Sequence, residues 1–520
     1  MRSRCAHGLI FVARRGGLHT DGTAPHHRGA GPVRETEHEF SRAATPGKRS
    51  PVTVVGMAAP TRPPSTSAPL ATATAPPRKR GRWIDDWRPE DPSFWETTGR
   101  PIARRNLFFS IFSEHIGFSI WSMWSVLVLF LPEPVFGIDP AGKFLLTTLP
   151  TALGAFVRLP YTFAVASFGG RNWTIVSAAL LLVPTIATAV VLEPGVSFTT
   201  LLVVSSLAGV GGGNFASSMA NINAFYPDRL KGWALGLNAG GGNLGVPVIQ
   251  LVGLLVLATA GADHPRVVLA VYLPLIVVAA VGAALLMDNL ATARNQPGAL
   301  RAAAREPHTW VMSFLYIGTF GSFIGFGFAF GQVLQNQFTD SFATPLAAAS
   351  LTWLGPLLGS LIRPLGGTLA DRFGGARITC ANFVAMAVGA AVVWTASRQA
   401  SLPMFVVGFV LLFVLSGIGN GSTYKMIPAI FRSQALTAVA EGGDADAADR
   451  RALRMSGALI GIAGAIGAFG GVLVNLAFRQ SFLTTGSGES AYLAFIAFYV
   501  VCVVVTWAVY LGPRTALGRV

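Results

Sequence analysis

The chain has 520 residues, and its 39 lysines and arginines outnumber the 24 aspartates and glutamates, which gives a formal net charge of +15. Apolar residues make up 52 % of the chain and charged residues only 12 %, about half of the roughly 25 % that is usual in soluble proteins. This composition excludes a water-soluble globular protein and a chain that is disordered over most of its length. It leaves a protein that crosses a membrane many times.

The first hundred residues differ from the rest of the chain. They hold 16 of the 39 basic residues and no apolar run near the ~20 residues that a membrane span requires. Proline-rich and basic runs such as 76–82 predict a disordered cytoplasmic tail over residues 1–100. The basic cluster fits an anionic membrane surface better than a nucleic acid. The stretch from Trp83 to Trp95 is expected to lead into the first span at the membrane interface.

From residue 104 onward, apolar stretches recur every ~33 residues, which is the length of one membrane helix and a short loop. The runs are continuous, so the predicted fold class is an all-α membrane protein with twelve transmembrane helices. These are expected near residues 105–131, 143–167, 174–193, 199–222, 232–257, 266–288, 309–333, 346–369, 377–396, 403–426, 454–478 and 491–512.

The basic residues also predict the orientation of the twelve helices. Past residue 100, sixteen lysines and arginines fall on the side of the termini and four on the opposite side. The positive-inside rule therefore puts both termini in the cytoplasm, with a multi-pass protein in the cell (inner) membrane. Most of the basic excess is explained by this topology, so no nucleic-acid partner is expected.

The two halves of the chain echo each other. Leu-Gly-x-x-x-Arg at 153–158 returns at 358–363, and Phe-Gly-Gly at 168–170 returns at 373–375, each 205 residues later. Repeats with a site at their interface are typical of secondary transporters. We expect an N-terminal six-helix half (101–288), a cytoplasmic linker (289–308) and a C-terminal six-helix half (309–520).

One loop resembles a known family motif. The segment 367–377 is similar to the cytoplasmic motif Gly-x-x-x-Asp-Arg-x-Gly-x-x-Arg of the major facilitator superfamily. The resemblance implies a conformational role for the motif residues Asp371, Arg372, Gly374 and Arg377. The first half keeps only the Phe-Gly-Gly-Arg part of the motif, without the aspartate.

Two arginines lie deep inside predicted spans. Arg158 and Arg363 occupy matched places in the repeat, about ten residues or ~15 Å from the cytoplasmic turn, which is near the middle of a ~30 Å core. They are expected to face one another, and two facing guanidinium groups repel unless an anion lies between them. Their planar donor fork suits a small planar oxyanion. Aromatic neighbours such as Phe156 and Phe320 would keep the site dry.

Two glycine-rich spans accompany the arginines. They run over 232–245, with Asn238, Gly240 and Asn243, and over 457–471, with Gly464 and Gly467. Close packing of small residues between helices explains such runs in part. The many glycines and the two asparagines also predict backbone that contacts a small polar substrate.

The runs 211–227 and 231–246, with the glycine stretch of the eleventh span, resemble signatures of the nitrate/nitrite porter family of the major facilitator superfamily. The likeness covers residues ~104–512 and implies a nitrate or nitrite carrier with rocker-switch alternation of its halves. It implies that Arg158 and Arg363 hold the anion and that Phe215, Tyr316 and Asn243 line the site. A carrier of another small anion, a non-transporting sensor and a membrane-embedded enzyme remain alternatives, but no catalytic set is found in the spans. No cofactor or metal is expected, and the protein is expected to act as a monomer.

Three further titratable residues are candidates for proton coupling: Glu114 and His115 in the first span and Lys425 in the tenth. One interpretation is a structural ion pair between Glu114 and Lys425. The other is that Glu114 or His115 takes a proton when the anion binds, which gives symport. The sequence slightly favours symport over exchange of nitrate for nitrite, because ionisable residues inside a membrane are costly to keep without a function.

Overall fold

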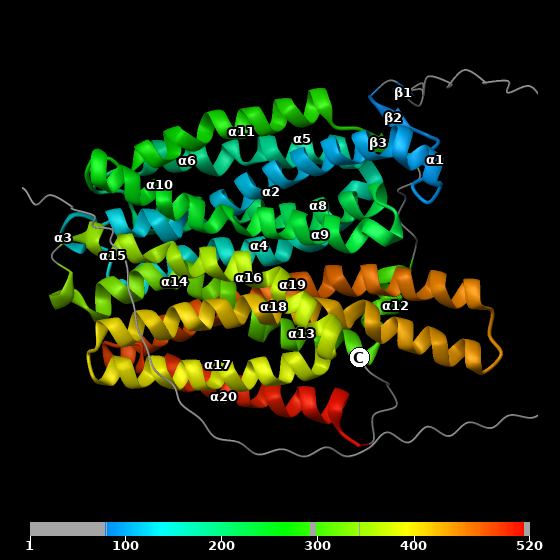
Figure 1. Ribbon diagram of the computed structural model, residues 1–520. Helices are drawn as coiled ribbons and strands as arrows, with labels where there is room; N and C mark the ends of the chain where they lie inside the picture. The colour runs from blue at the N-terminus through cyan, green and yellow to red at the C-terminus, as the bar shows by residue number, and fades with distance from the viewer. Residues whose placement is uncertain (1–77, 80, 292–297, 343, 514–520) are drawn as a thin grey trace, which may run out of the picture. The chain divides into compact units, whose positions relative to one another are not determined.

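The computed structural model describes residues 78–79, 81–291, 298–342 and 344–513, and the predicted tail up to residue 77 lies outside this range. Helices dominate the described residues. In Figure 1 the helices up to α11, coloured blue to green, gather in one group, and those from α13, coloured green to red, gather in another. These two groups are the six-helix halves that the internal repeat predicts.

The first half contains six spans, of which several are broken into two helices. Apart from the short helices α1 and α3, which are not spans, the six spans are α2, α4, α5 with α6, α7 with α8, α9 with α10, and α11. Their bounds are Pro92–Phe94 (α1), Arg100–Leu127 (α2), Glu133–Phe136 (α3), Pro140–Phe168 (α4), Gly170–Leu180 (α5), Leu182–Val191 (α6), Phe198–Leu207 (α7), Asn214–Phe225 (α8), Asp228–Asn243 (α9), Gly245–Thr259 (α10) and Arg266–Leu286 (α11).

The second half repeats this pattern after the short connecting helix α12. Its spans are α13 with α14, α15 with α16, α17, α18, α19 and α20. Their bounds are Ala299–Arg305 (α12), Pro307–Tyr316 (α13), Ser322–Gln337 (α14), Pro345–Thr352 (α15), Leu354–Phe373 (α16), Gly375–Arg398 (α17), Leu402–Ala440 (α18), Ala445–Thr485 (α19) and Glu489–Thr506 (α20).

Eleven of these spans in the described residues are long and apolar enough to cross a membrane. The twelfth is α2, whose 28 residues are long enough but include Glu114, His115 and a series of serines that make it more polar. Since α2 packs among the other spans of its half, its polar side chains are shielded by protein instead of facing lipid. The predicted twelve-helix architecture is therefore the observed one.

The tenth and eleventh spans are longer than the sequence predicts. The expected spans end at residue 426 and begin at residue 454, whereas α18 continues to Ala440 and α19 begins at Ala445. The apolar run sets the length buried in lipid but not the end of the helix. The turn comes only at Gly442, which has a φ of +93°, and Asp444 then caps α19 by accepting the Ala447 N–H at 2.9 Å.

The disordered tail is predicted to run to residue 100, but its described part is folded. Strand β1 (Arg78–Lys79) pairs antiparallel with β2 (Trp83–Ile84), and β2 pairs in parallel with β3 (Asn289–Leu290), just after α11. Trp87 and Trp95 are buried against Phe225 and its neighbours. Isolated tryptophans in a polar stretch anchor this segment, and composition averaged over the tail does not reveal them.

The repeat is visible in the geometry of both halves. Gly169 and Gly374, which follow the matched phenylalanines, have φ of +89° and +94° and end α4 and α16 in the same way. A Cβ on Gly209 would lie 2.8 Å from the backbone nitrogen of Gly154. In the second half Gly417 approaches the backbone of Gly359 in the same manner. The matched glycines therefore allow the same close helix pairs in each half.

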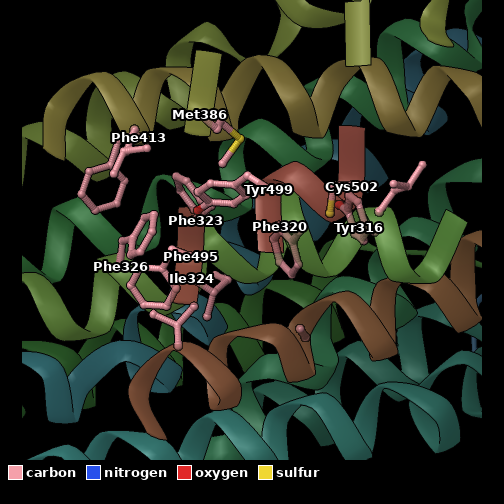
Figure 2. Packing of buried hydrophobic residues seen from close by; sticks show 14 of the residues in the cluster. Tyr316, Phe320, Phe323, Ile324, Phe326, Met386, Phe413, Phe495, Tyr499 and Cys502 are labelled. Atoms are coloured by element: carbon pink, nitrogen blue, oxygen red, sulfur yellow. The ribbon is translucent and has the colours of Figure 1, made fainter. Parts of the chain in front are cut away.

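An aromatic core fills the second half and reaches the interface between the halves. Figure 2 shows Tyr316, Phe320 and Phe323 of one segment together with Tyr499 and Cys502 of α20. The segment between α13 and α14, Ile317–Gly321, forms a π-helical turn, a local feature that is common at functional sites. This core positions the rings that surround the two buried arginines.

Candidate functional site

Arg158 lies on α4 and is fully buried. Its Nε donates to the Gly212 carbonyl at 3.1 Å, and its Nη1 donates to the Gly464 carbonyl at 2.9 Å. Gly212 belongs to a 3₁₀ segment, Ala208–Gly213, between α7 and α8, whereas Gly464 belongs to α19 of the other half. The Arg158 side chain thus bridges the two halves of the protein.

Aromatic rings surround the Arg158 guanidinium. Its carbon lies 4.8 Å from the ring centre of Phe215, 4.9 Å from that of Phe320 and 5.2 Å from that of Trp121. Ring faces attract a cation, and the attraction is stronger where water is excluded. The rings therefore offset part of the desolvation penalty that a charge pays in this position.

Arg363 lies on α16 and is 7 % exposed. Its Nη2 donates to the Tyr316 hydroxyl at 3.3 Å, and its guanidinium carbon lies 5.4 Å from the ring centre of Tyr424. Both partners belong to the second half. Arg363 is therefore held within its own half, by fewer contacts than Arg158.

The two arginines belong to one cluster. Tyr316, which bonds Arg363, stacks on Phe320 with ring centres 5.2 Å apart and an angle of 8°. Phe320 in turn contacts Arg158. The two guanidinium groups also interact electrostatically with each other. The structure thus brings together the pair that the repeat predicts to be facing.

Three buried donors in this cluster have no hydrogen-bond partner among the described residues. They are Nη2 of Arg158, Nη1 of Arg363 and the Tyr424 hydroxyl. Buried polar groups are nearly always satisfied in a stable protein. Two positive groups, an extra hydroxyl donor and aromatic walls together suit a small planar anion that accepts hydrogen bonds.

Besides the two arginines, four predicted residues lie in this cluster. The Phe215 ring covers Arg158, the Tyr316 hydroxyl accepts from Arg363, and the Gly464 carbonyl accepts from Arg158. Gly467 lies against the Tyr316 ring so closely that an added Cβ would overlap its Cδ1. The close packing predicted for this glycine is therefore found.

Other predicted residues lie differently. Asn243 is buried at the break between α9 and α10, and neither polar atom of its amide has a partner among the described residues. At Gly240 no atom lies within 4 Å of an added Cβ, so the close packing predicted there is wrong. Phe156 is 70 % exposed and does not wall the site, because it lies on the opposite face of α4 from Arg158.

Glu114 forms a second buried polar cluster beside the arginines. Asn238 donates to its Oε2 at 2.6 Å, the Ser218 hydroxyl donates to the same oxygen, and Asn238 also contacts Ser218 at 2.8 Å. The other carboxyl oxygen, Oε1, is buried without a partner among the described residues. Glu114 interacts electrostatically with both Arg158 and Arg363. Asn238, predicted to contact substrate, thus holds this carboxyl group.

The remaining titratable candidates lie outside this cluster. His115 contacts the Gly241 carbonyl through Nδ1 at 3.1 Å. Lys425 pairs with Asp371 of the predicted loop motif at 2.8 Å, and both side chains are about half exposed. The ion pair considered between Glu114 and Lys425 is therefore wrong, because Lys425 faces the end of α16 rather than the interior. In the same loop motif, Arg372 contacts the Phe373 ring, Gly374 ends α16, and Arg377 is exposed.

Sequence reasoning missed Trp121, Ser218 and Tyr424. It also missed Phe118, whose ring centre lies 6.0 Å from the guanidinium carbon of Arg158. One signal was present for two of them, because residues 114, 118 and 121 follow the i, i+4, i+7 spacing of one helix face. A charged residue in a span, followed by aromatics at this spacing, indicates that the aromatics share its surroundings. Ser218 and Tyr424 carry no comparable signal.

Comparison with known proteins agrees with this fold. The model of the Major Facilitator Superfamily matches residues 107–443. Among solved structures, a D-xylose–proton symporter superposes with a TM-score of 0.57 at 13 % identity, over 80 % of this chain and 99 % of that chain. A bacterial homologue of the lysosomal transporter Spinster gives a TM-score of 0.55 at 17 % identity, over 78 % and 97 %. The chain is a multi-pass transporter of the major facilitator superfamily and not an enzyme.

The curated relatives narrow the family further. The chain is 38 % identical to the nitrate/nitrite transporter NarU of Escherichia coli K12 over 453 residues, which cover 83 % of this chain and 97 % of the relative. It is 32 % identical to the probable nitrate/nitrite antiporter NarK2 of Thermus thermophilus over 455 residues, with the same coverage. The chain belongs to the nitrate/nitrite porter family of the major facilitator superfamily.

Proposed function

We propose that this protein carries nitrate, nitrite or both across the membrane by alternating access. The observation that carries the proposal is the pair of buried arginines inside one aromatic cluster, each with an N–H group that no described residue bonds. A planar oxyanion accepts hydrogen bonds from both forks, and its negative charge relieves their mutual repulsion. Asn243, whose buried amide has no partner in the part of the chain that the structure describes, is a further candidate to line this site.

The proposed alternation breaks and remakes contacts between the halves. Near Lys143, at the start of α4, Thr147 donates to the Asn475 side chain at 3.0 Å, and Gln332 reaches Thr147 at 3.4 Å. Arg158 adds its bond to Gly464 nearer the middle of the molecule. An anion that competes for the Arg158 guanidinium weakens this inter-half bond, which links substrate binding to movement of the halves.

Glu114 supplies a reason for proton-coupled symport. With Glu114 ionised, the empty site carries two positive charges and one negative charge. Binding of nitrate together with one proton on Glu114 leaves the same net charge, so loaded and empty carriers meet the same electrostatic barrier. Ser218 and Asn238 hold the carboxyl group in place through Oε2. The other oxygen, Oε1, has no partner among the described residues and is available for the proton.

The test is uptake of labelled nitrate into proteoliposomes without internal anion. An inward proton gradient is expected to drive uptake, and Glu114→Gln is expected to abolish this dependence on the gradient. Lys425→Gln is the matched control, because it removes an exposed charge that pairs with Asp371 and not with a residue of the cluster. Uptake seen only with internal nitrite, and equal in the Glu114→Gln protein, would establish exchange instead.

The proposed location is the inner membrane of a bacterial cell, with both termini in the cytoplasm and one chain as the functional unit. The distribution of basic residues supports this orientation. A fluorescent protein fused after Val520 is expected to be fluorescent, and alkaline phosphatase at the same place is expected to be inactive. The opposite pair of results would invert the topology.

A further inference from the structure

A surface cavity of about 540 Å³ lies where the folded lead-in segment meets α2 and the beginning of α9. Its lining combines three arginines, one glutamate, three large aromatic residues and one leucine. These residues are Trp95, Glu96, Arg100, Arg104, Tyr226, Arg229, Leu230 and Trp233. The cavity contains none of the residues of the arginine cluster, so it is a separate site.

The cavity has an excess of positive charge. Arg100 pairs with Glu96 at 3.1 Å, which neutralises both groups. Arg104 and Arg229 are exposed and have no hydrogen-bond or ion-pair partner among the described residues. Two guanidinium groups from different helices therefore remain available on one cavity, an arrangement that suits a phosphate group.

Tyr226 adds a buried donor to the same cavity. The residue is 2 % exposed, and its hydroxyl has no partner among the described residues. Burial raises the pKa of Tyr226 to about 12, so the hydroxyl keeps its proton at physiological pH and is able to donate. It also interacts electrostatically with Arg104. A buried donor without a partner indicates that the site accepts a ligand atom.

The aromatic residues indicate the source of the phosphate. The Trp95 and Tyr226 rings lie 5.5 Å apart, and Trp233 lies 6.2 Å from Tyr226 with 58 % of its surface exposed. Tryptophan and tyrosine beside arginine are characteristic of the membrane interface, where the ring meets acyl chains and the charge meets headgroups. A free phosphate ion would gain nothing from this apolar surface.

We propose that this cavity binds the phosphate headgroup of an anionic membrane lipid. Arg104, Arg229 and the Tyr226 hydroxyl donate to the phosphate, and the acyl chains run along Trp233. The proposal rests on the orientation proposed above, which places this end of the bundle at the cytoplasmic leaflet, where anionic lipids occur.

The experiment measures lipid binding to the full-length purified protein in detergent. Phosphatidylglycerol, phosphatidylcholine and inorganic phosphate are titrated, and bound lipid is counted by native mass spectrometry alongside the thermal unfolding midpoint. The double variant Arg104→Gln/Arg229→Gln is expected to bind phosphatidylglycerol about 25-fold more weakly, since each lost charge near an anionic surface weakens binding about fivefold. Tyr226→Phe is expected to weaken it about fivefold, which is the effect of one hydrogen bond.

The matched control is Arg432→Gln/Arg451→Gln, which removes two exposed arginines from α18 and α19 away from the cavity. Equal loss of binding in this control, equal binding of phosphatidylcholine, or unchanged binding in the cavity variants would overturn the proposal. Saturation by inorganic phosphate at the same concentration would identify a phosphate site instead of a lipid site. Nitrate counterflow is measured separately, so failure of the proposed transport function leaves the lipid result independent.

Discussion

Arg158 and Arg363 are equivalent by sequence, yet the structure holds them in different ways. Arg158 donates to two backbone carbonyls, is covered by aromatic rings and reaches across to the opposite half. Among the described residues, the Arg363 side chain has one hydrogen bond, to Tyr316, and one nearby ring, that of Tyr424, both from its own half. A repeat in the sequence thus preserves the residue and its depth but not its bonding.

This difference separates two tasks, sensing the relative position of the halves and binding the anion, which both arginines would share in a symmetric site. The proposed movement of one half against the other would break the bond from Arg158 to Gly464, whereas the bond from Arg363 to Tyr316 would survive because both residues belong to the same half. We infer that Arg158 senses the relative position of the halves. Arg363 then serves chiefly to bind the anion.

The largest expected effect comes from the lysine variants. Arg158→Lys and Arg363→Lys keep the charge but lose the planar donor fork, and each is expected to reduce nitrate uptake by about 10- to 100-fold, because a hydrogen bond to a charged group contributes about 1.5–3 kcal/mol. Uptake into proteoliposomes measures this. Near-normal uptake by both variants would remove the basis of the proposed site.

The same two variants are also expected to differ in stability. Arg158→Lys loses two buried hydrogen bonds and is expected to lower the free energy of unfolding by about 2–4 kcal/mol. Arg363→Lys is expected to lower it by at most about half as much. Thermal unfolding of the purified proteins gives the order, and a less stable Arg363→Lys protein would contradict the asymmetry.

A smaller effect is expected from a matched pair of glycines. In Gly467→Ala the new methyl group overlaps the Tyr316 ring and displaces the partner of Arg363, so uptake is expected to fall about tenfold, the effect of losing one such bond. In Gly240→Ala the methyl group meets no atom within 4 Å. That variant is expected to transport normally, with a helix stabilised by up to about 1 kcal/mol. Equal defects in both would show that helix flexibility, and not contact with Tyr316, limits transport.

The smallest effect is expected from removing single hydroxyl groups. Tyr316→Phe loses the bond to Arg363 at 3.3 Å, whereas Tyr424→Phe loses a hydroxyl that has no partner among the described residues. Both are expected to raise the nitrate concentration for half-maximal uptake by about threefold to tenfold. Only Tyr316→Phe is expected to lower the unfolding midpoint. A lower midpoint for Tyr424→Phe with unchanged uptake would assign Tyr424 to packing alone.

The sequence predicts the architecture well because the bilayer constrains it. Twelve apolar runs, the matched glycines and the two deep arginines follow from the length of a span and from the high energy of a buried charge. Phe215 and Tyr316 are implied by the family resemblance and Gly464 is predicted from its glycine-rich span, and the structure places all three against the arginines.

Lateral contacts between helices are what the sequence leaves open. Glu114 and Lys425 are both charges within apolar runs, but only Glu114 is enclosed, by Ser218 and Asn238 of two other helices. Lys425 is instead about half exposed and pairs with Asp371. Hydropathy indicates how deep a residue lies along a helix but not which side of the helix it lies on. The sequence alone therefore does not distinguish the environments of the two charges.

The small sheet beside α11 has a mechanical consequence for the connection between the halves. Strand β3 begins that connection, and it is fastened to the first half by β2, by the Asn289 contact with the Arg171 N–H and by the pairing of Asp288 with Arg82 and Arg105. The fastening extends to Ala291, whose N–H donates to the Ile84 carbonyl at 3.0 Å. From there to Gly298 a fully extended chain spans at most about 25 Å. The folded lead-in segment thus shortens the length of chain that connects the two halves. It limits how far the halves can separate at this end.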